Sequence, residues 1–340
     1  MMRPLHVCVA LALFILAVGR IGAGPPLQGD RERRDKFTAD LKAALAAEAT
    51  AAGKAAALSR AYQAESNPDV RRLVFEHLPP QPDATIDRFL AGVLTGDADA
   101  GIRGLAAQAL GTHGTDQCLP ALAKAAASDM VTEARMGCIV GQGTARRPAT
   151  FAIAELAARY PKLADKAATA LRELTPPDDP KADLESLADA RAQALYQVTR
   201  DEKLLAPFLR RLRSKDAKVR ESGAVAFRFF KLKVAPPELV KALSDADAGV
   251  RSWAGLALGE IADPKTVPAL LAVASDPKQD AGVRCNVIHS LGRMKAADAT
   301  ELMRKLLGDE REAVQVQAAI ALYRLTGEKV KQFPAGYKAD

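Results

Sequence analysis

The residues of this sequence best suited to binding chemistry are basic ones gathered in a single segment. Between positions 210 and 233 the chain carries nine lysines and arginines against two acids, a net charge as large as the formal +7 of all 340 residues. These cations are Arg210, Arg211, Arg213, Lys215, Lys218, Arg220, Arg228, Lys231 and Lys233. Clustered positive charge raises the local concentration of anions. The segment therefore predicts either a polyanion-binding surface or a solvated helix face.

The second candidate is Trp253, the only tryptophan of the chain. Tryptophan is enriched among the residues that anchor protein–protein interfaces. In the other copies of the repeated motif described below, the equivalent position varies among Leu, Gly, Gln, Ser and Asn. Such variation is not expected of a fixed core position. Two interpretations stay open, packing between repeats and an exposed aromatic anchor on a concave face.

Signatures of catalysis and of metal binding are missing from the sequence. The histidines His6, His77, His113 and His289 are far apart, and no Cys-x-x-Cys, Gly-rich phosphate loop or Gly-x-Ser-x-Gly occurs. Zinc sites and nucleophilic active sites need such residues at short, fixed spacing. We therefore expect no catalysis, no cofactor and no metal.

A near-duplication indicates which elements position these residues. The stretch DADAGIRGLAAQALGTH at 97–113 returns as DADAGVRSWAGLALGEI at 245–261. Aligned on the arginine of this motif, and mostly 29 to 33 residues apart, the copies carry Arg71, Arg103, Arg135, Arg191, Arg220, Arg251 and Arg284. Gln315 takes this place in a last copy, and Lys166 in a degenerate copy at 162–174. Self-similarity at this period is typical of stacked repeats.

Each unit is predicted to contain two helices. Apolar residues of the motif, such as Val250, Ala254 and Leu258, recur at helical spacing. An aspartate four residues before the arginine is a good N-cap, and proline in the first turn of the other helix costs no hydrogen bond. One such hairpin cannot bury enough apolar surface to fold alone, so the units must stack.

The recurring arginine requires a partner, because a positive charge in the first turns of a helix opposes the helix dipole. We predict a ladder in which each arginine pairs with the capping aspartate of the adjacent unit. The residues of this ladder are Asp99, Arg103, Asp216, Arg220, Asp247, Arg251, Asp280 and Arg284. The alternative is a functional row of arginines that binds anions.

The recurring pattern D-x-x-V-R-x-x-A-x-x-A-L-G resembles HEAT repeats, of a subtype similar to the phycocyanobilin lyase HEAT-like repeats, over about residues 67–325. The resemblance implies an all-α, right-handed α-solenoid of stacked two-helix repeats, a fold that serves mostly as a binding scaffold. Iron-dependent deoxyhypusine hydroxylases resemble this architecture but need several His-Glu pairs, whereas this sequence has the reversed pair Glu76–His77. The motif fades between 136 and 184, where we expect altered turns.

The flanks of the array differ from it in composition. Residues 1–24 resemble a secretory signal peptide, with Arg3 before an apolar run shorter than the roughly 20 residues that span a membrane. They predict an exported chain, periplasmic or extracellular, with no membrane span after cleavage; their retention as an anchor stays open. Residues 25–65 predict an N-terminal helical cap broken at Gly53, 66–326 an array of about eight units, and 327–340 a polar, disordered tail.

Cys118 and Cys138 are predicted to face each other on two antiparallel helices. Facing helices lie about 8–10 Å apart, whereas a disulfide needs Cα atoms within about 7 Å. We therefore favour reduced, buried thiols, with a disulfide as the open alternative.

Together these features predict an exported HEAT-repeat scaffold that binds another protein along its concave surface and performs no catalysis. The alternatives are a polyanion-binding protein that uses residues 210–233 and a HEAT-type enzyme. Nucleic acid is not an expected partner, because DNA-binding proteins of this shape work inside the cell.

Overall fold

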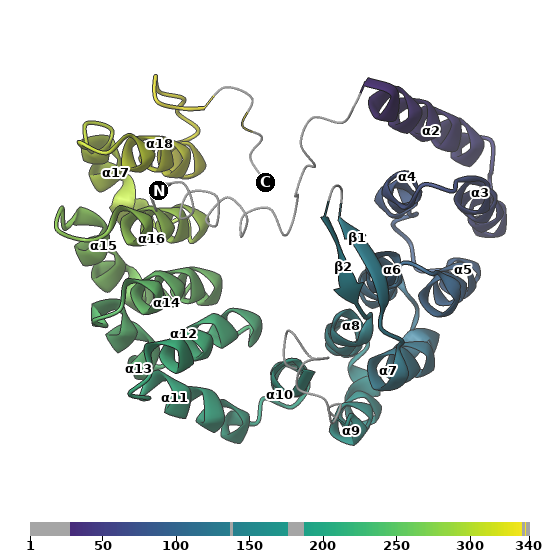
Figure 1. Cartoon of the computed structure of the whole chain (residues 1–340), viewed down its shortest axis with the longest axis horizontal. Helices are drawn as coiled ribbons and strands as arrows, with labels where there is room; N and C mark the ends of the chain where they lie inside the picture. The colour runs from purple at the N-terminus through teal and green to yellow at the C-terminus, as the bar shows by residue number, and fades with distance from the viewer. Residues whose placement is uncertain (1–27, 137–138, 176–186, 335–336, 338–340) are drawn as a thin grey trace. The chain divides into compact units, whose positions relative to one another are not determined.

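The computed structural model describes residues 28–136, 139–175, 187–334 and 337 of the chain. They form two compact units, one that ends at Asp201 and one that begins at Glu202 (Figure 1). Each unit is a stack of helices around a core rich in leucine and alanine.

The N-terminal unit begins with two long helices and contains one pair of strands. Its elements are α2 (Gln28–Ala46), α3 (Ala51–Ala64), α4 (Pro68–Arg71) with its 3-10 continuation η1 (Arg72–His77), α5 (Ala84–Gly96), α6 (Ala100–His113), α7 (Leu119–Ser128), β1 (Thr132–Met136), β2 (Ile139–Gly143), α8 (Arg146–Arg159), α9 (Ala164–Glu173) and α10 (Leu187–Thr199).

The C-terminal unit is a regular succession of helix pairs. Its elements are α11 (Ala206–Leu212), α12 (Ala217–Ala226) with the 3-10 turn η5 (Phe227–Phe229), α13 (Pro237–Lys241) with η6 (Ala242–Ser244), α14 (Ala248–Ile261), α15 (Val267–Ser275), α16 (Ala281–Arg293), α17 (Thr300–Leu306) and α18 (Glu312–Thr326).

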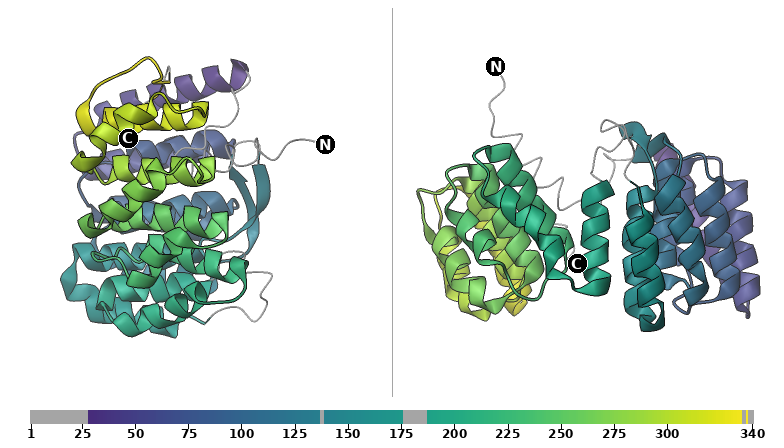
Figure 2. Two further views of the ribbon diagram at one scale, coloured as in Figure 1. Left: turned by 90° about the vertical axis from the view of Figure 1, so that its left-hand side faces the viewer. Right: turned by 90° about the horizontal axis from the view of Figure 1, so that it is seen from below.

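Within each unit the helices form two layers. The motif helices, which follow the capping residue and carry the recurring position, are α4, α6, α8, α10, α12, α14, α16 and α18. In the C-terminal unit α12, α14, α16 and α18 pack on one another in that order, and the intervening helices make the second layer (Figure 2). The predicted all-α fold of stacked two-helix repeats is thereby confirmed within each unit.

A β-hairpin interrupts the N-terminal unit where the repeat was aligned on Arg135. Strands β1 and β2 pair antiparallel, with Thr132 opposite Gly143, so Arg135 lies in a strand and not in a motif helix. The β-branched Ile139 and Val140 favour this conformation. The spacing of Arg135 matched the repeat period, but the hairpin is an insertion between α7 and α8.

Arg146, at the start of α8, takes the recurring position instead. Its Nε donates to the Ala126 carbonyl at 3.1 Å, just as Arg284 Nε donates to the Ala274 carbonyl at 3.0 Å. Lys166, which was aligned as a degenerate copy, lies in α9 of the other layer. The alignment at Lys166 was therefore wrong.

Two expectations about the ends of the array are also corrected. The break between α2 and α3 precedes residue 51, where Thr50 caps α3 by accepting from the Gly53 N–H at 3.0 Å, so Gly53 lies inside a helix.

The tail is packed and not disordered where it is described. Phe333 lies 4.9 Å from the Tyr323 ring and 5.4 Å from the Tyr337 ring, measured between centroids, and so covers the last helix.

Some expectations fall on residues outside the described ranges. Residues 1–24 and Cys138 are among them. The helix predicted for this part of the chain is wrong, because residues 132–136 and 139–143 form strands. Cys118 is a buried free thiol, and burial raises its pKa to about 12. None of the described helices is both long and apolar enough to cross a membrane.

The glycine of the A-L-G motif allows neighbouring motif helices to touch through their backbones. A Cβ built on Gly111 of α6 would lie 2.8 Å from the Cα of Ala152 in α8. The equivalent distance from Gly259 to the Cα of Ser290 is 2.9 Å, and from Gly292 to the Cα of Ala321 it is 3.0 Å. A Cβ at Gly111 or Gly259 would force the two helices apart, and at Gly292 it would be tightly packed, so this position favours glycine in these repeats.

The close approach makes a direct prediction for Gly111→Ala. The added methyl group should lower the free energy of unfolding by about 1–2 kcal/mol, because it pushes two packed helices apart. The matched control is Gly92→Ala on the exposed surface of α5, where a Cβ meets nothing within 4 Å. That control should raise the free energy of unfolding by about 0.5–1 kcal/mol through helix propensity. Denaturant unfolding measures both; stabilisation by both substitutions would contradict the packing.

Candidate binding surface

The four aspartates of the predicted ladder cap their own helices. Asp247 accepts from the Val250 N–H at 3.1 Å, and Asp99 accepts from the Ile102 N–H at 3.0 Å. In the other two caps, Asp216 accepts from the Lys218 N–H and Asp280 accepts from the Gly282 N–H, each at 2.8 Å. The prediction that these aspartates hold the ladder arginines was wrong, because Arg103, Arg220 and Arg284 pair with other acids and Arg251 bonds to a glutamine.

Four of the recurring arginines pair with a different acid, which lies in the turn after the helix that separates two motif helices. Arg220 donates two hydrogen bonds to Asp245, from Nε to Oδ2 at 2.7 Å and from a terminal nitrogen to Oδ1 at 2.8 Å. The corresponding pairs elsewhere are Arg71 with Asp97, Arg103 with Asp129, and Arg284 with Asp309. Arg251 departs from the rule, because its Nε donates to the side chain of Gln279 at 3.0 Å.

In Arg103, Arg220 and Arg251 a second arm of the side chain secures the turn that precedes the arginine's own helix. Arg220 Nη1 donates to the carbonyls of Ser214 and Lys215 at 3.0 and 2.9 Å. Arg103 and Arg251 bond in the same way to the carbonyls six and five residues before them. Gln315 keeps one of these bonds, to the carbonyl of Asp309 at 2.6 Å. We call this two-armed contact of the recurring arginine the arginine bracket.

The two aspartates of the repeated DAD sequence thus have separate structural roles. In 245–247 the first aspartate receives Arg220 of the preceding repeat and also the backbone N–H of Asp247 at 2.9 Å, while the second caps α14. The hydrogen bond from Arg220 lowers the pKa of Asp245 below its ordinary value and outweighs burial. Because Arg103 and Arg284 are almost fully buried, the recurring arginines do not form an exposed anion-binding row.

The basic segment 210–233 is partly neutralised within its own stack. Four of its cations are in ion pairs: Arg213 with Glu238, Lys218 with Glu221, Arg220 with Asp245, and Arg228 with Glu260. Arg211 stacks on Phe208, with 4.8 Å between the guanidinium carbon and the ring centroid. The exposed cations are spread over α11 and its C-cap, the turn before α12, α12 itself and the loop after η5: Arg210, Arg213, Lys215, Lys218, Lys231 and Lys233.

Trp253 is partly exposed and bridges two repeats. Its Nε1 donates to Glu221 Oε1 at 3.0 Å, which ties α14 to α12. The guanidinium carbon of Arg228 lies 5.6 Å from the Trp253 ring centroid and 5.9 Å from that of Phe229. The indole is therefore fixed by inter-repeat contacts while part of its surface remains accessible.

Three arginines, from the repeats of α12, α16 and α18, act on the buried His289, and one of them, Arg228, also lies beside Trp253. Glu260 Oε1 accepts from Arg228 at 3.4 Å and also pairs with Arg293. Arg324 of α18 donates to Nδ1 of His289 at 3.3 Å and to the Tyr337 hydroxyl at 2.8 Å. Arg228, Arg293 and Arg324 are called the arginine cluster below.

The positive charge of this arginine cluster affects the pKa of His289. Burial lowers the pKa of His289 to about 3, and the positive charges of Arg324, Arg293 and Arg228 act in the same direction. The imidazole is consequently neutral, with Nδ1 as the acceptor for Arg324.

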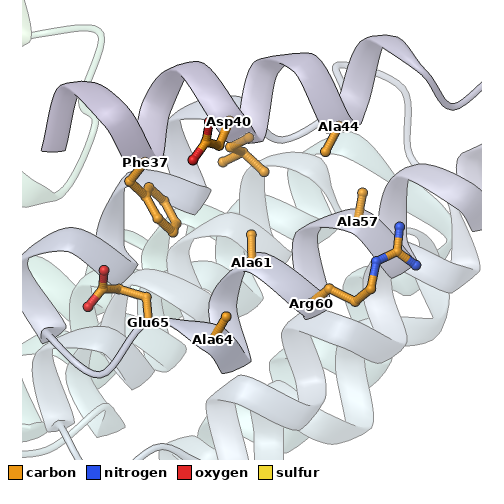
Figure 3. A pocket seen from close by; sticks show the side chains of 9 residues that line it. Phe37, Asp40, Ala44, Ala57, Arg60, Ala61, Ala64 and Glu65 are labelled. Atoms are coloured by element: carbon orange, nitrogen blue, oxygen red, sulfur yellow. The ribbon is translucent and has the colours of Figure 1, made fainter. Parts of the chain in front are cut away.

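A shallow groove lies between α2 and α3 (Figure 3). Its cavity volume is about 350 Å³, and side chains such as Phe37, Leu41 and Ala61 line it, with Asp40 and Arg60 also at its walls. Glu65 at one end is paired with Arg33. The groove is mainly apolar and brings together no set of convergent polar groups.

The described residues offer no candidate metal centre, since no three His, Cys, Asp or Glu side chains gather there in a way that could hold an ion. The ring of His77 is bonded to the Leu73 carbonyl at 3.0 Å. Burial raises the pKa of Cys285 to about 11, which keeps this thiol protonated.

Comparison with known families identifies the type of repeat. Residues 205–281 and 278–333, the range of α11 to α18, match the family model of HEAT repeats. Residues 102–128, which form α6 and α7, match the PBS lyase HEAT-like repeat. The chain is a HEAT-repeat protein. A search of curated proteins finds no match to its sequence.

Solved structures similar to this HEAT-repeat protein are distant. Human deoxyhypusine hydroxylase in complex with glycerol is 15% identical over 82% of this chain and 97% of its own, with a TM-score of 0.35. The Escherichia coli protein YibA is 16% identical over 89% and 100%, also at 0.35. The CpcE–CpcF complex of phycocyanin lyase from Nostoc sp. PCC7120 is 21% identical over 74% and 70%, at 0.22. Likeness at this level carries no argument about activity.

Sequence reasoning singled out Arg228 and Trp253 but missed the residues that surround them in this HEAT-repeat protein. Glu260, Arg293 and Arg324 each stand nine residues after the recurring position of their repeat, at Arg251, Arg284 and Gln315. That shared offset was a detectable signal, since it places three charges on the same face of three neighbouring motif helices.

The arginine bracket predicts unequal effects for two similar substitutions. Arg220→Ala leaves the partly buried carboxylate of Asp245 without its counter-charge and should lower the free energy of unfolding by about 2–3 kcal/mol at pH 7. Arg251→Ala is the matched control, because its partner Gln279 is uncharged, and should cost about 1 kcal/mol. Urea unfolding of both variants measures the difference.

The pH dependence tests the cause of that difference. Because the folded-state pKa of Asp245 is lowered, its stabilising contribution is complete above the ordinary carboxyl pKa of about 4 and is lost as the pH falls through the lowered value. The difference between the two variants in the free energy of unfolding should therefore become smaller as the pH is lowered. Equal losses at pH 7 would show that the charge of Asp245 does not hold the repeats together.

Proposed function

We propose that this HEAT-repeat protein is an exported scaffold that binds another protein along the surface of its motif helices and performs no catalysis. The observation that carries the proposal is Trp253, a partly exposed indole fixed between two repeats by Glu221 and Arg228. Tryptophan and arginine held in place before binding are the residue types that dominate protein interfaces.

The repeat architecture supports this assignment. Stacked repeats contact only their neighbours, so the outward positions of the motif helices are free to vary and form one extended binding surface. Trp253 and the arginine cluster all lie on consecutive motif helices or the turns that continue them. Export is proposed from the sequence of residues 1–24, which has the charge and length of a secretory signal.

The test is capture of a partner by the full chain from an extracytoplasmic extract, followed by the binding constant with Trp253→Ala. We expect at least a tenfold loss of affinity for the captured protein, since a central aromatic anchor contributes about 2 kcal/mol or more. The control is Val234→Ala, another exposed apolar residue of the same unit. Equal affinities for the two variants would contradict the proposal.

The salt dependence of the same interaction addresses the polyanion alternative. Binding through residues 210–233 should fall about tenfold or more between low and moderate salt. Binding anchored by Trp253 should change much less. Mass spectrometry of the exported chain should find an N-terminus near residue 24; recovery of the intact chain only from the cytoplasm would overturn export.

A further inference from the structure

We propose that the C-terminal tail is a cap that prevents the last repeat from associating with a second copy of this chain. The tail, residues 328–333 together with Tyr337, packs on the side of α18 where a further motif helix would stack. This inference does not depend on the proposed function, because it concerns self-association and not the binding of another protein.

Contacts between earlier repeats show which side of a motif helix faces the next one. Ser252 Oγ of α14 accepts from the side-chain amide of Asn286 in α16 at 2.5 Å, and a Cβ built on Gly255 would lie 2.7 Å from Val287 of α16. Together with the close-contact glycine Gly259, these residues stand one, four and eight positions after the recurring arginine. We call these three positions the stacking face.

The stacking face of α18 is apolar and carries a ring in place of the close-contact glycine. Its residues are Val316, Ala319 and Tyr323. Tyr323 stands at the position at which Gly292 of α16 admits α18, so a further helix pair cannot approach α18 in the same way. Gln315 replaces the recurring arginine here, so the last repeat lacks the charged arm that pairs with an acid of a following turn.

The tail folds back beside α18 and covers this ring (Figure 1). Gly327 ends the helix with φ +78°, in the left-handed region that favours glycine, and its N–H donates to the Tyr323 carbonyl at 2.8 Å. The Phe333 ring then lies 4.9 Å from the Tyr323 ring, measured between centroids. Gln332 Nε2 donates to the Leu307 carbonyl at 3.1 Å, which fixes the tail to the end of α17.

A cation and a second ring complete the cap. Lys329 Nζ lies 5.5 Å from the Tyr323 ring centroid and 5.6 Å from that of Phe333. The Tyr337 ring packs edge-on against Phe333, at an interplanar angle of 85°. Lys329 and Lys331 are exposed, so the cap presents charge to water, as the terminal unit of a stack of repeats must.

A second copy of this chain is the partner that fits the stacking face of α18. The same apolar positions would meet in a two-fold contact, which is self-complementary. α18 is acidic in its first turn, at Glu312, and basic in its last, at Arg324, so two antiparallel copies would bring opposite charges together. A head-to-tail contact with α2 would instead have to bury its exposed Arg31, Glu32 and Asp35.

The experiment measures the mass of the full chain in solution by light scattering and sedimentation over a wide range of protein concentration. The unmodified chain should be a monomer. Phe333→Ser uncovers Tyr323 and should form dimers, with a dissociation constant at least about tenfold below the limit set by the unmodified chain. Phe333→Tyr keeps a ring at this position and should behave as the unmodified chain does.

A pair of lysine variants keeps the test valid if Phe333→Ser does not fold. Lys329→Ser, at an exposed position, removes the cation beside both rings and should also favour the dimer, although less strongly. Lys331→Ser is the matched control, because it removes the same charge from another exposed position of the tail, and it should leave the mass unchanged. Equal dimerisation of the two lysine variants would overturn the proposal, since the net charge of the tail would then explain it.

A second substitution identifies the surface through which Phe333→Ser associates. Val316→Glu places a charge on the stacking face and should return Phe333→Ser to the monomer, whereas Val234→Glu, at an exposed apolar residue elsewhere in the unit, should not. A Phe333→Ser chain that stays monomeric, dimers that persist with Val316→Glu, or an unmodified chain that dimerises as tightly would each overturn the proposal. Oligomers that grow beyond the dimer would contradict the two-fold contact.

Discussion

The arginine bracket is the interaction on which the rest of the structure depends. One guanidinium in a repeat holds the carbonyls of the turn before its own helix and an acid in the turn before the next motif helix, as Arg220 does with Ser214 and Asp245. It thereby sets the distance and the rotation between successive repeats. The backbone contact at glycines such as Gly259 joins the same motif helices.

These contacts do not use the outward positions of the motif helices. The bracket, the capping aspartate and the close-contact glycine fix the stack, while the positions two and nine residues after the recurring arginine are used by none of these contacts. Trp253 and Arg293 occupy such positions. A partner that recognises this surface reads residues that the fold itself does not require.

Sequence patterns could predict the helices, the caps and the stacking because each follows from local chemistry. Asp99 and Asp247 were recognised as N-caps, and they are. Their DAD context holds two acids, and a pattern cannot say which one reaches the arginine of another repeat; the structure assigns that role to Asp245. The strand around Arg135 escaped detection because its spacing imitated the repeat. The arginine cluster arises only when three repeats stack, so its parts look like ordinary surface charges in the sequence.

The most direct test of this account is deletion of residues 216–246, which removes one complete repeat with Arg220 and its partner Asp245 together. The shortened chain should remain soluble and helical and unfold in a cooperative transition, because Arg251 then meets the turn at Ser214 and Lys215 that Arg220 held before. Deletion of residues 216–236 removes Arg220 but leaves Asp245, and should prevent cooperative folding of this unit. If the full-period deletion is as damaging as the shorter one, the repeats are not joined by the arginine bracket.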